Sequence, residues 1–137
     1  MNPFPVAVRR TDDSAVFFDM AAEGAVMLRR CLVCGVVRGP QELVCGACHH
    51  TDWEPVAAQG TASLVSWTAV HRSPVPGLDA PYTVALVECP EGPWMFVRLL
   101  DSDGRDLHEG MTVHFVTART GEDGESIVAA CVSGQER

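Results

Sequence analysis

Two hydrophobic periods divide the chain into a short helical segment and a longer β-rich one. Between residues 12 and 24 the apolar residues recur at the spacing of one helical face: Val16, Phe17, Met20 and Ala21. The polar residues 12–14 offer an N-cap, and Gly24 offers a stop. A helix of about ten residues is too short to be stable alone in water, so its apolar face must pack on this chain or on another one.

From residue 56 onward, five β-rich runs replace the helical period, each bounded by Gly, Pro or Asp clusters. The runs are residues 60–71, 81–89, 94–100, 111–118 and 126–132. In the fourth run, the alternation places Val113 and Phe115 on one face and His114 on the other. Five strands of this length predict a small closed barrel.

The segments around these elements have distinct characters. Residues 25–30 are expected to form a strand, and residues 36–44 a turn between short strands. Residues 1–11 contain two prolines and show no period, which indicates an extended arm. Residues 71–81 are long and proline-rich, which is typical of a surface loop that carries contacts.

Four of the six cysteines form two C-x2-C pairs with ten residues between them: Cys31, Cys34, Cys45 and Cys48. Two such turns supply the four thiolates of a tetrahedral zinc site and leave no coordination position for water or substrate. We therefore expect a structural metal, zinc in preference to iron. A dithiol redox centre would need only one pair, on a thioredoxin-like scaffold that this sequence does not offer.

Composition and charge narrow the classes of function. The chain has 137 residues, a net charge of −8 and ten basic residues, all of them arginine. This charge repels a polyphosphate backbone unless the arginines gather on one face. No apolar run approaches the ~20 residues needed to cross a bilayer, and residues 1–13 lack the order of a signal peptide. We expect a cytoplasmic protein, where C-x2-C pairs hold metal more often than they form disulfides.

The order of these parts resembles the acyl-CoA-associated family in which a rubredoxin-like zinc ribbon precedes an OB-fold, the domain of unknown function thirty-five. The resemblance covers about residues 14–118. Besides the cysteines, its marks are Phe17 and Phe18, Gly24, Pro40, Trp53, Gly60 and Thr61, Pro81 and Tyr82, residues 85–87, and residues 91–92. It implies a mainly β fold, with an arm and helix in residues 1–24, the zinc ribbon in 25–55 and a five-stranded OB-fold barrel in 56–137.

The resemblance also implies a role. Members of the family partner thiolase-superfamily enzymes: thiolases, acyltransferases, and aldolases that shorten sterol side chains held as CoA thioesters. A non-catalytic accessory subunit is therefore implied, which supports its partner's fold and its CoA channel in a four-chain complex with two copies of each subunit. The candidates for contact with the partner or with a CoA thioester are Phe17, Phe18, Arg29, Arg30, His71, Arg72 and Tyr82. The arginine pairs 9–10 and 29–30 would suit CoA phosphates.

Two other functions compete with this one. Ribbon and OB-fold also occur together in single-stranded nucleic-acid-binding proteins, and four aromatic residues could provide stacking: Trp67, Tyr82, Trp94 and Phe96. The negative charge argues against that function. A thiolate at Cys89 beside His71 would be an activated nucleophile. A lone cysteine that ends an apolar strand is more often a small buried hydrophobe.

Overall fold

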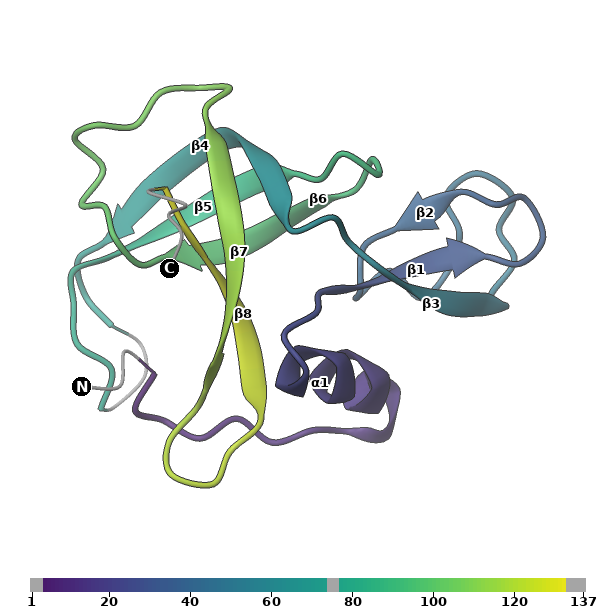
Figure 1. The fold of residues 1–137 in the computed structure, drawn as a ribbon, viewed down its shortest axis with the longest axis horizontal. Helices are drawn as coiled ribbons and strands as arrows, with labels where there is room; N and C mark the ends of the chain where they lie inside the picture. The colour runs from purple at the N-terminus through teal and green to yellow at the C-terminus, as the bar shows by residue number, and fades with distance from the viewer. Residues whose placement is uncertain (1–3, 74–76, 133–137) are drawn as a thin grey trace.

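The computed structural model describes residues 4–73 and 77–132 of the 137. One short helix comes first, then a small three-stranded sheet, then a five-stranded closed barrel (Figure 1). The small sheet projects from one side of the barrel, and the helix lies between the two. The predicted mainly β fold with an N-terminal helix and a closed OB-type barrel is confirmed. No helix in the described part of the chain is long and apolar enough to cross a membrane.

The helix begins with one 3-10 turn, Asp12–Ser14, and continues as α1, Ala15–Ala22. The backbone N–H of Thr11 donates to Ser14 Oγ at 2.8 Å, which fixes the first turn. Past the last turn, the N–H of Ala25 donates to the carbonyl of Met20 at 2.9 Å, so the chain turns off at Gly24 as expected. The buried face of α1 packs on strands of both the small sheet and the barrel.

The small sheet contains β1, Met27–Cys31, between β2, Val37–Arg38, and β3, Trp53–Ala57. Both neighbours run antiparallel to β1. Met27 and Leu28 on β1 are almost fully buried. Because β3 pairs with β1 along its whole length, this sheet extends beyond the boundary expected at residue 55, and we place the division from the barrel at residues 58–60.

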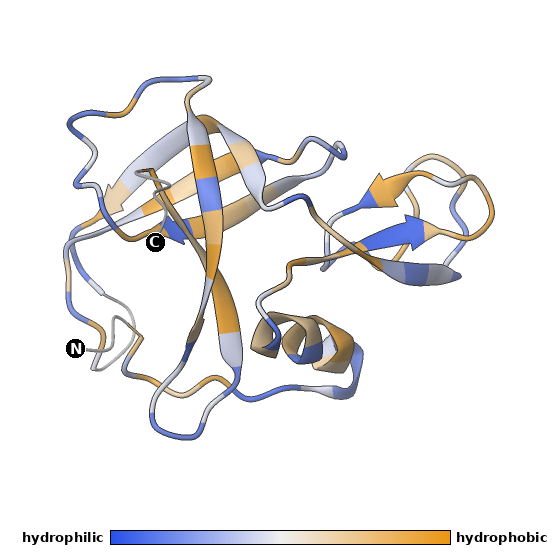
Figure 2. Ribbon diagram, in the orientation of Figure 1, coloured by the Kyte–Doolittle hydropathy of each residue, from blue (hydrophilic) through white to orange (hydrophobic). Residues whose placement is uncertain are grey.

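The barrel has the strand order β4, β5, β6, β8, β7, and pairing of β7 with β4 closes it. Its strands are β4, Thr61–Val70, β5, Tyr82–Glu88, β6, Trp94–Leu99, β7, Thr112–Arg119, and β8, Ser126–Cys131. Alternate side chains point inward and form the core: Ala62, Leu64, Ala85, Val87, Val97, Leu99, Val113 and Ala130. In Figure 2 these strands are mostly hydrophobic.

The extended N-terminal arm is bound to the hairpin between β7 and β8 (Figure 1). The N–H of Glu125 donates to the carbonyl of Val8 at 2.8 Å, and the N–H of Val8 donates to Thr120 Oγ1 at 2.8 Å. The hairpin can approach this closely because Gly124 has no side chain. A Cβ there would lie 2.6 Å from the Thr120 carbonyl oxygen and 2.9 Å from Ala7 Cα.

The close approach of arm and hairpin gives a testable result. Gly124→Ala must push the arm or the hairpin aside, so we expect the free energy of unfolding to fall by roughly 1–3 kcal/mol. Gly46→Ala is the matched control, because a Cβ at Gly46 meets nothing within 4 Å. Thermal unfolding followed by circular dichroism measures both variants. Equal stability of the two would contradict this account of the arm.

Candidate functional site

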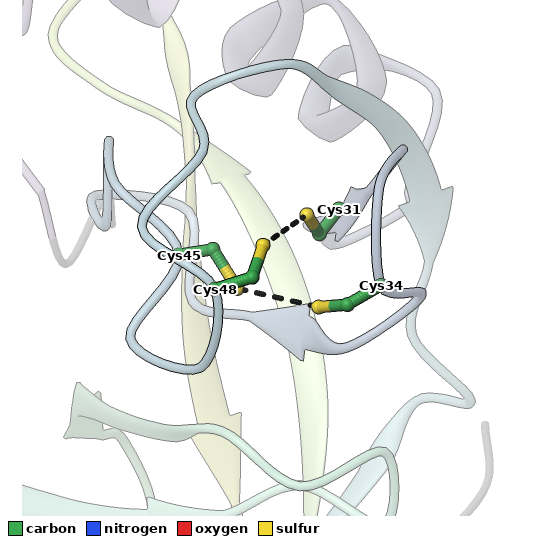
Figure 3. A group of neighbouring side chains, drawn as sticks. All are labelled: Cys31, Cys34, Cys45 and Cys48. Atoms are coloured by element: carbon green, nitrogen blue, oxygen red, sulfur yellow. Dashed lines mark hydrogen bonds between the residues drawn. The ribbon is translucent and has the colours of Figure 1, made fainter.

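The four paired cysteines come together in one cluster, as the sequence indicates (Figure 3). Their sulfur atoms all lie within 4.8 Å of one another. The Sγ atoms of Cys31 and Cys48 are 3.5 Å apart, and those of Cys34 and Cys45 are 3.6 Å apart. Cys31 ends β1, whereas the other three lie in the two loops of the ribbon.

The two C-x2-C turns have the same backbone geometry. In the first, the N–H of Gly35 donates to the Cys31 carbonyl at 3.0 Å; in the second, the N–H of His49 donates to the Cys45 carbonyl at 2.8 Å. The residue after each pair is left-handed, with φ of 81° at Gly35 and 67° at His49. The sequence signal for this equivalence is that Gly35 and His49 each stand directly after a C-x2-C pair. His49 therefore serves the turn and remains exposed.

The cluster fits a tetrahedral metal site. Four sulfurs about 2.3 Å from one metal ion lie about 3.8 Å from each other, close to the separations observed here. Backbone N–H groups of Cys34 and Val33 lower the pKa of the Cys31 thiol to about 6, and those of Cys48 and Ala47 lower the pKa of the Cys45 thiol. These bonds favour the thiolate at Cys31 and Cys45, the form that binds a metal, whereas burial and the three neighbouring thiols raise the pKa of Cys48 to about 12.

Two buried arginines hold the ribbon loops in place. Arg29 on β1 lies 4.0 Å over the ring of Trp53, and its Nε donates to the Pro40 carbonyl at 2.7 Å. Arg38, its neighbour on β2, donates from Nε to the Glu42 carbonyl at 2.6 Å. Arg29 is only 4% exposed, and burial lowers the pKa of its guanidinium. Arg29 thus has no surface to offer CoA or a partner, and its role is structural.

The other candidates of the N-terminal half divide between interior and surface. Phe18 is 8% exposed and belongs to the buried face of α1, so its truncation would act on stability. Phe17 is half-buried and meets the Phe18 ring edge-on at 5.3 Å. Arg30 is exposed and paired with Glu54 at 2.5 Å. Arg9 and Arg10 are paired with the protein's own carboxylates, those of Asp123, Asp19 and Glu125.

The three remaining candidates, His71, Arg72 and Tyr82, lie at the end of β4 and the start of β5. His71 and Arg72 are exposed, and His71 and Tyr82 line a cavity of about 520 Å³. The Arg98 guanidinium lies 5.1 Å over the Tyr82 ring. The same cavity is lined by three carboxylates, of Asp101, Asp103 and Asp106, which disfavour a CoA phosphate there.

The alternative of a Cys89 and His71 nucleophile is wrong. The register pairs Val70 with Tyr82 and Ser63 with Glu88, so His71 and Cys89 lie at opposite ends of β5. At ~3.3 Å per residue, about 20 Å separates them. Burial, with the nearby carboxylate of Glu91, raises the pKa of Cys89 to about 11, so at neutral pH this group is a thiol.

Known proteins resemble this chain over most of its length. Residues 55–118 match the family model described as "ChsH2, C-terminal OB-fold domain". A "DUF35 domain-containing scaffold protein" of Methanocaldococcus jannaschii is 32% identical over 98 residues, 70% of each chain. A "Probable enoyl-CoA hydratase alpha subunit" of Thermomonospora curvata is 34% identical over 113 residues, 82% of this chain. The matched region is 34% of that relative, so the chain spans about a third of its length.

Solved structures agree with this similarity. The structure named "Ltp2-ChsH2(DUF35) aldolase" is 27% identical, with a TM-score of 0.78 over 90% of this chain and 97% of that one. A DUF35 family protein of unknown function from Sulfolobus solfataricus shares the fold, with a TM-score of 0.61 over 88% of this chain and 85% of that one, at 16% identity. The resemblance drawn from the motif order is confirmed, and the chain belongs to the family of DUF35 domain-containing scaffold proteins.

Proposed function

We propose that this protein is a non-catalytic accessory subunit of a thiolase-superfamily enzyme that acts on acyl-CoA thioesters. The observation that carries the proposal is the similarity, over nearly the whole chain, to the DUF35 chain of an aldolase named with a second component, Ltp2. The relative named as an enoyl-CoA hydratase subunit supports the same acyl-CoA context. The partner would be a thiolase, an acyltransferase or a sterol side-chain aldolase.

The site chemistry supports a non-catalytic role. With four cysteines as ligands, the metal site would be closed to water and substrate, as structural sites are. The one candidate nucleophile weighed from the sequence, Cys89, is separated from His71 and protonated at neutral pH. The reacting groups would therefore come from the partner, and this subunit would act on the partner's fold or CoA channel.

The assembly follows from symmetry. A two-fold partner dimer offers two equivalent docking sites, so we propose a four-chain complex with two copies of each subunit. Exposed Arg30 and Arg72 remain the basic candidates for CoA at the interface, and Phe17 and Tyr82 the aromatic ones. We further propose that the complex acts in the cytoplasm, away from membranes.

Single-stranded nucleic acid is a weaker candidate ligand. Trp94 and Phe96 are exposed on an OB-fold strand, as a stacking platform would require. The net charge is −8, however, and two of the arginines, Arg29 and Arg38, are buried in the ribbon. Without a basic groove, stacking alone gives little affinity for a phosphate backbone.

The metal proposal can be tested by composition and by mutation. We expect one zinc ion per folded chain in elemental analysis, held by Cys31, Cys34, Cys45 and Cys48. Structural zinc supplies on the order of 10 kcal/mol of folding free energy, so Cys31→Ser should unfold the ribbon and release the metal. Cys131→Ser, outside the cluster, is the control and should keep full zinc content. Folded protein without metal would refute the assignment. An absorption spectrum of iron bound to thiolates would show that the metal is iron and not zinc.

The accessory role can be tested by reconstitution. The purified protein and the thiolase-superfamily subunit encoded next to it should co-elute in size-exclusion chromatography at micromolar concentration, at the mass of a four-chain complex. The partner's carbon–carbon bond-forming or bond-cleaving activity should rise at least tenfold in the complex, while this protein alone should show none. Separate elution, together with partner activity that this protein leaves unchanged, would defeat the proposal.

A further inference from the structure

Strand β6 is paired along only one of its edges. β5 pairs with β6 over the whole length of the strand, from Trp94 to Leu99. On the other side, β8 meets β6 only at its end, where Leu99 lies opposite Ala130. The register of this seam therefore contains a single residue pair, and the first part of β6 is not paired with β8.

The direction of each amide follows from one hydrogen bond. The N–H of Cys89 donates to the carbonyl of Pro93 at 2.9 Å across the β5–β6 turn. Because the pattern of an antiparallel ladder alternates, the amides of Met95 face β5 and those of Trp94 and Phe96 face away from it. Among residues 4–73 and 77–132, β8 pairs with β6 only at Leu99, so no strand faces Phe96 on that side. The ribbon loop approaches the Trp94 carbonyl, since a Cβ at Gly39 would lie 3.8 Å from that oxygen.

The open edge borders a cavity of about 350 Å³ between β6, α1 and the ribbon loop 39–42. Four successive residues of β6, 94–97, line this cavity. Side chains alternate between the two faces of a strand, so successive residues line one cavity only where the cavity borders the edge of the strand. The walls are largely apolar: Phe17 and Phe18 from α1, Pro40 from the ribbon, and Val97 and Val128 from the barrel. A strand placed here would meet apolar side chains as well as free amides.

This edge lacks the features that normally protect an exposed strand. Natural edge strands carry charges, prolines or bulges that prevent pairing with another chain. Residues 94–97 contain no charge, no proline and no register shift, and the side chains of Trp94 and Phe96 are 52% and 74% exposed. An unprotected apolar edge of this kind is suited to being covered.

We propose that β6 receives an extended segment of the partner enzyme subunit as an added strand. This inference rests on the proposed accessory function. The segment's amides would bond to the N–H of Trp94 and to the N–H and carbonyl of Phe96, and its apolar side chains would fill the cavity. Glu42 lines the cavity, residues 12–13 at its α1 side are acidic, and the chain carries −8, so the segment should be flanked by Lys or Arg. A second copy of this chain would bring the same negative charge and is disfavoured.

Hydrogen–deuterium exchange of single amides tests the added strand directly. The probe is the thiolase-superfamily subunit encoded next to this chain, mixed with the intact protein. We expect the Trp94 and Phe96 amides to exchange at least tenfold more slowly in the complex than in the free protein. The Met95 amide, already bonded to β5, should be protected in both states and is the internal control.

Two variants at one position separate the amide from the side chain. Phe96→Ala and Phe96→Pro both remove the ring, but only Phe96→Pro removes the N–H, which the free protein does not use. Both should fold, and Phe96→Pro should bind the partner at least tenfold more weakly than Phe96→Ala. Met95→Pro removes a ladder bond and should destabilise the barrel. If Met95→Pro folded and Phe96→Pro did not, the assignment of the Met95 amide to β5 and of the Phe96 amide to the open edge would be wrong.

The remaining outcomes distinguish this inference from the accessory role. If the complex forms but the Trp94 and Phe96 amides still exchange fast and the two Phe96 variants bind equally, the added strand is refuted and the accessory role stands. If no complex forms, both are refuted. If the same amides become protected when this protein alone is concentrated, the occupant is a second copy and the partner assignment is overturned.

Discussion

The ribbon depends on the convergence of four sulfur atoms. Its sheet has strands of five, two and five residues, too few to bury a core of their own. The two long loops have little regular structure, and the contacts that fix them include the sulfur cluster and the guanidinium groups of Arg29 and Arg38. Both arginines donate to carbonyls of the loops. In a β-sheet, such carbonyls would accept from the backbone N–H groups of a neighbouring strand. The sulfur cluster and the charge-assisted bonds at the carbonyls therefore take the place of a hydrophobic core.

The helix connects the ribbon to the barrel. α1 packs on β1 of the ribbon and on β7 and β8 of the barrel, so the same eight residues contribute to both units. The N-terminal arm then fixes the start of the helix by binding the β7–β8 hairpin. Because α1 covers β8 and leaves the edge of β6 open, the helix also forms one wall of the cavity beside that edge.

Periodicity and cysteine spacing predicted the helix, the five barrel strands and the sulfur cluster, since each is a local pattern in the sequence. The roles of Arg29 and Phe18 could not be predicted this way. An arginine beside another arginine looks like a surface charge, and only the pairing of β1 with β2 and β3 buries Arg29 against Trp53. The helical period placed Val16 and Phe17 on the apolar face with Met20 and Ala21. In the structure the buried residues of α1 are Phe18 and Ala21, and Val16 is exposed, because the packing of the helix on the two sheets sets its rotation. The binding of the arm joins residues more than 100 positions apart, for which no local signal exists.

The burial of Arg29 and Phe18 removes two of the contact residues that family resemblance indicated from the surface available to a partner. The most exposed large apolar side chains of the described residues lie in two places: the ribbon loops, with Leu32, Val33, Val36, Leu43 and Val44, and β6, with Trp94 and Phe96. The loop residues surround sulfur atoms, and exclusion of water from a metal–thiolate site is a sufficient reason for their presence. Trp94 and Phe96 lie away from the sulfur atoms, on β6, and are exposed beside the cavity that α1 and the ribbon loop form. The partner strand proposed above would satisfy the amides of this edge as well as cover the rings.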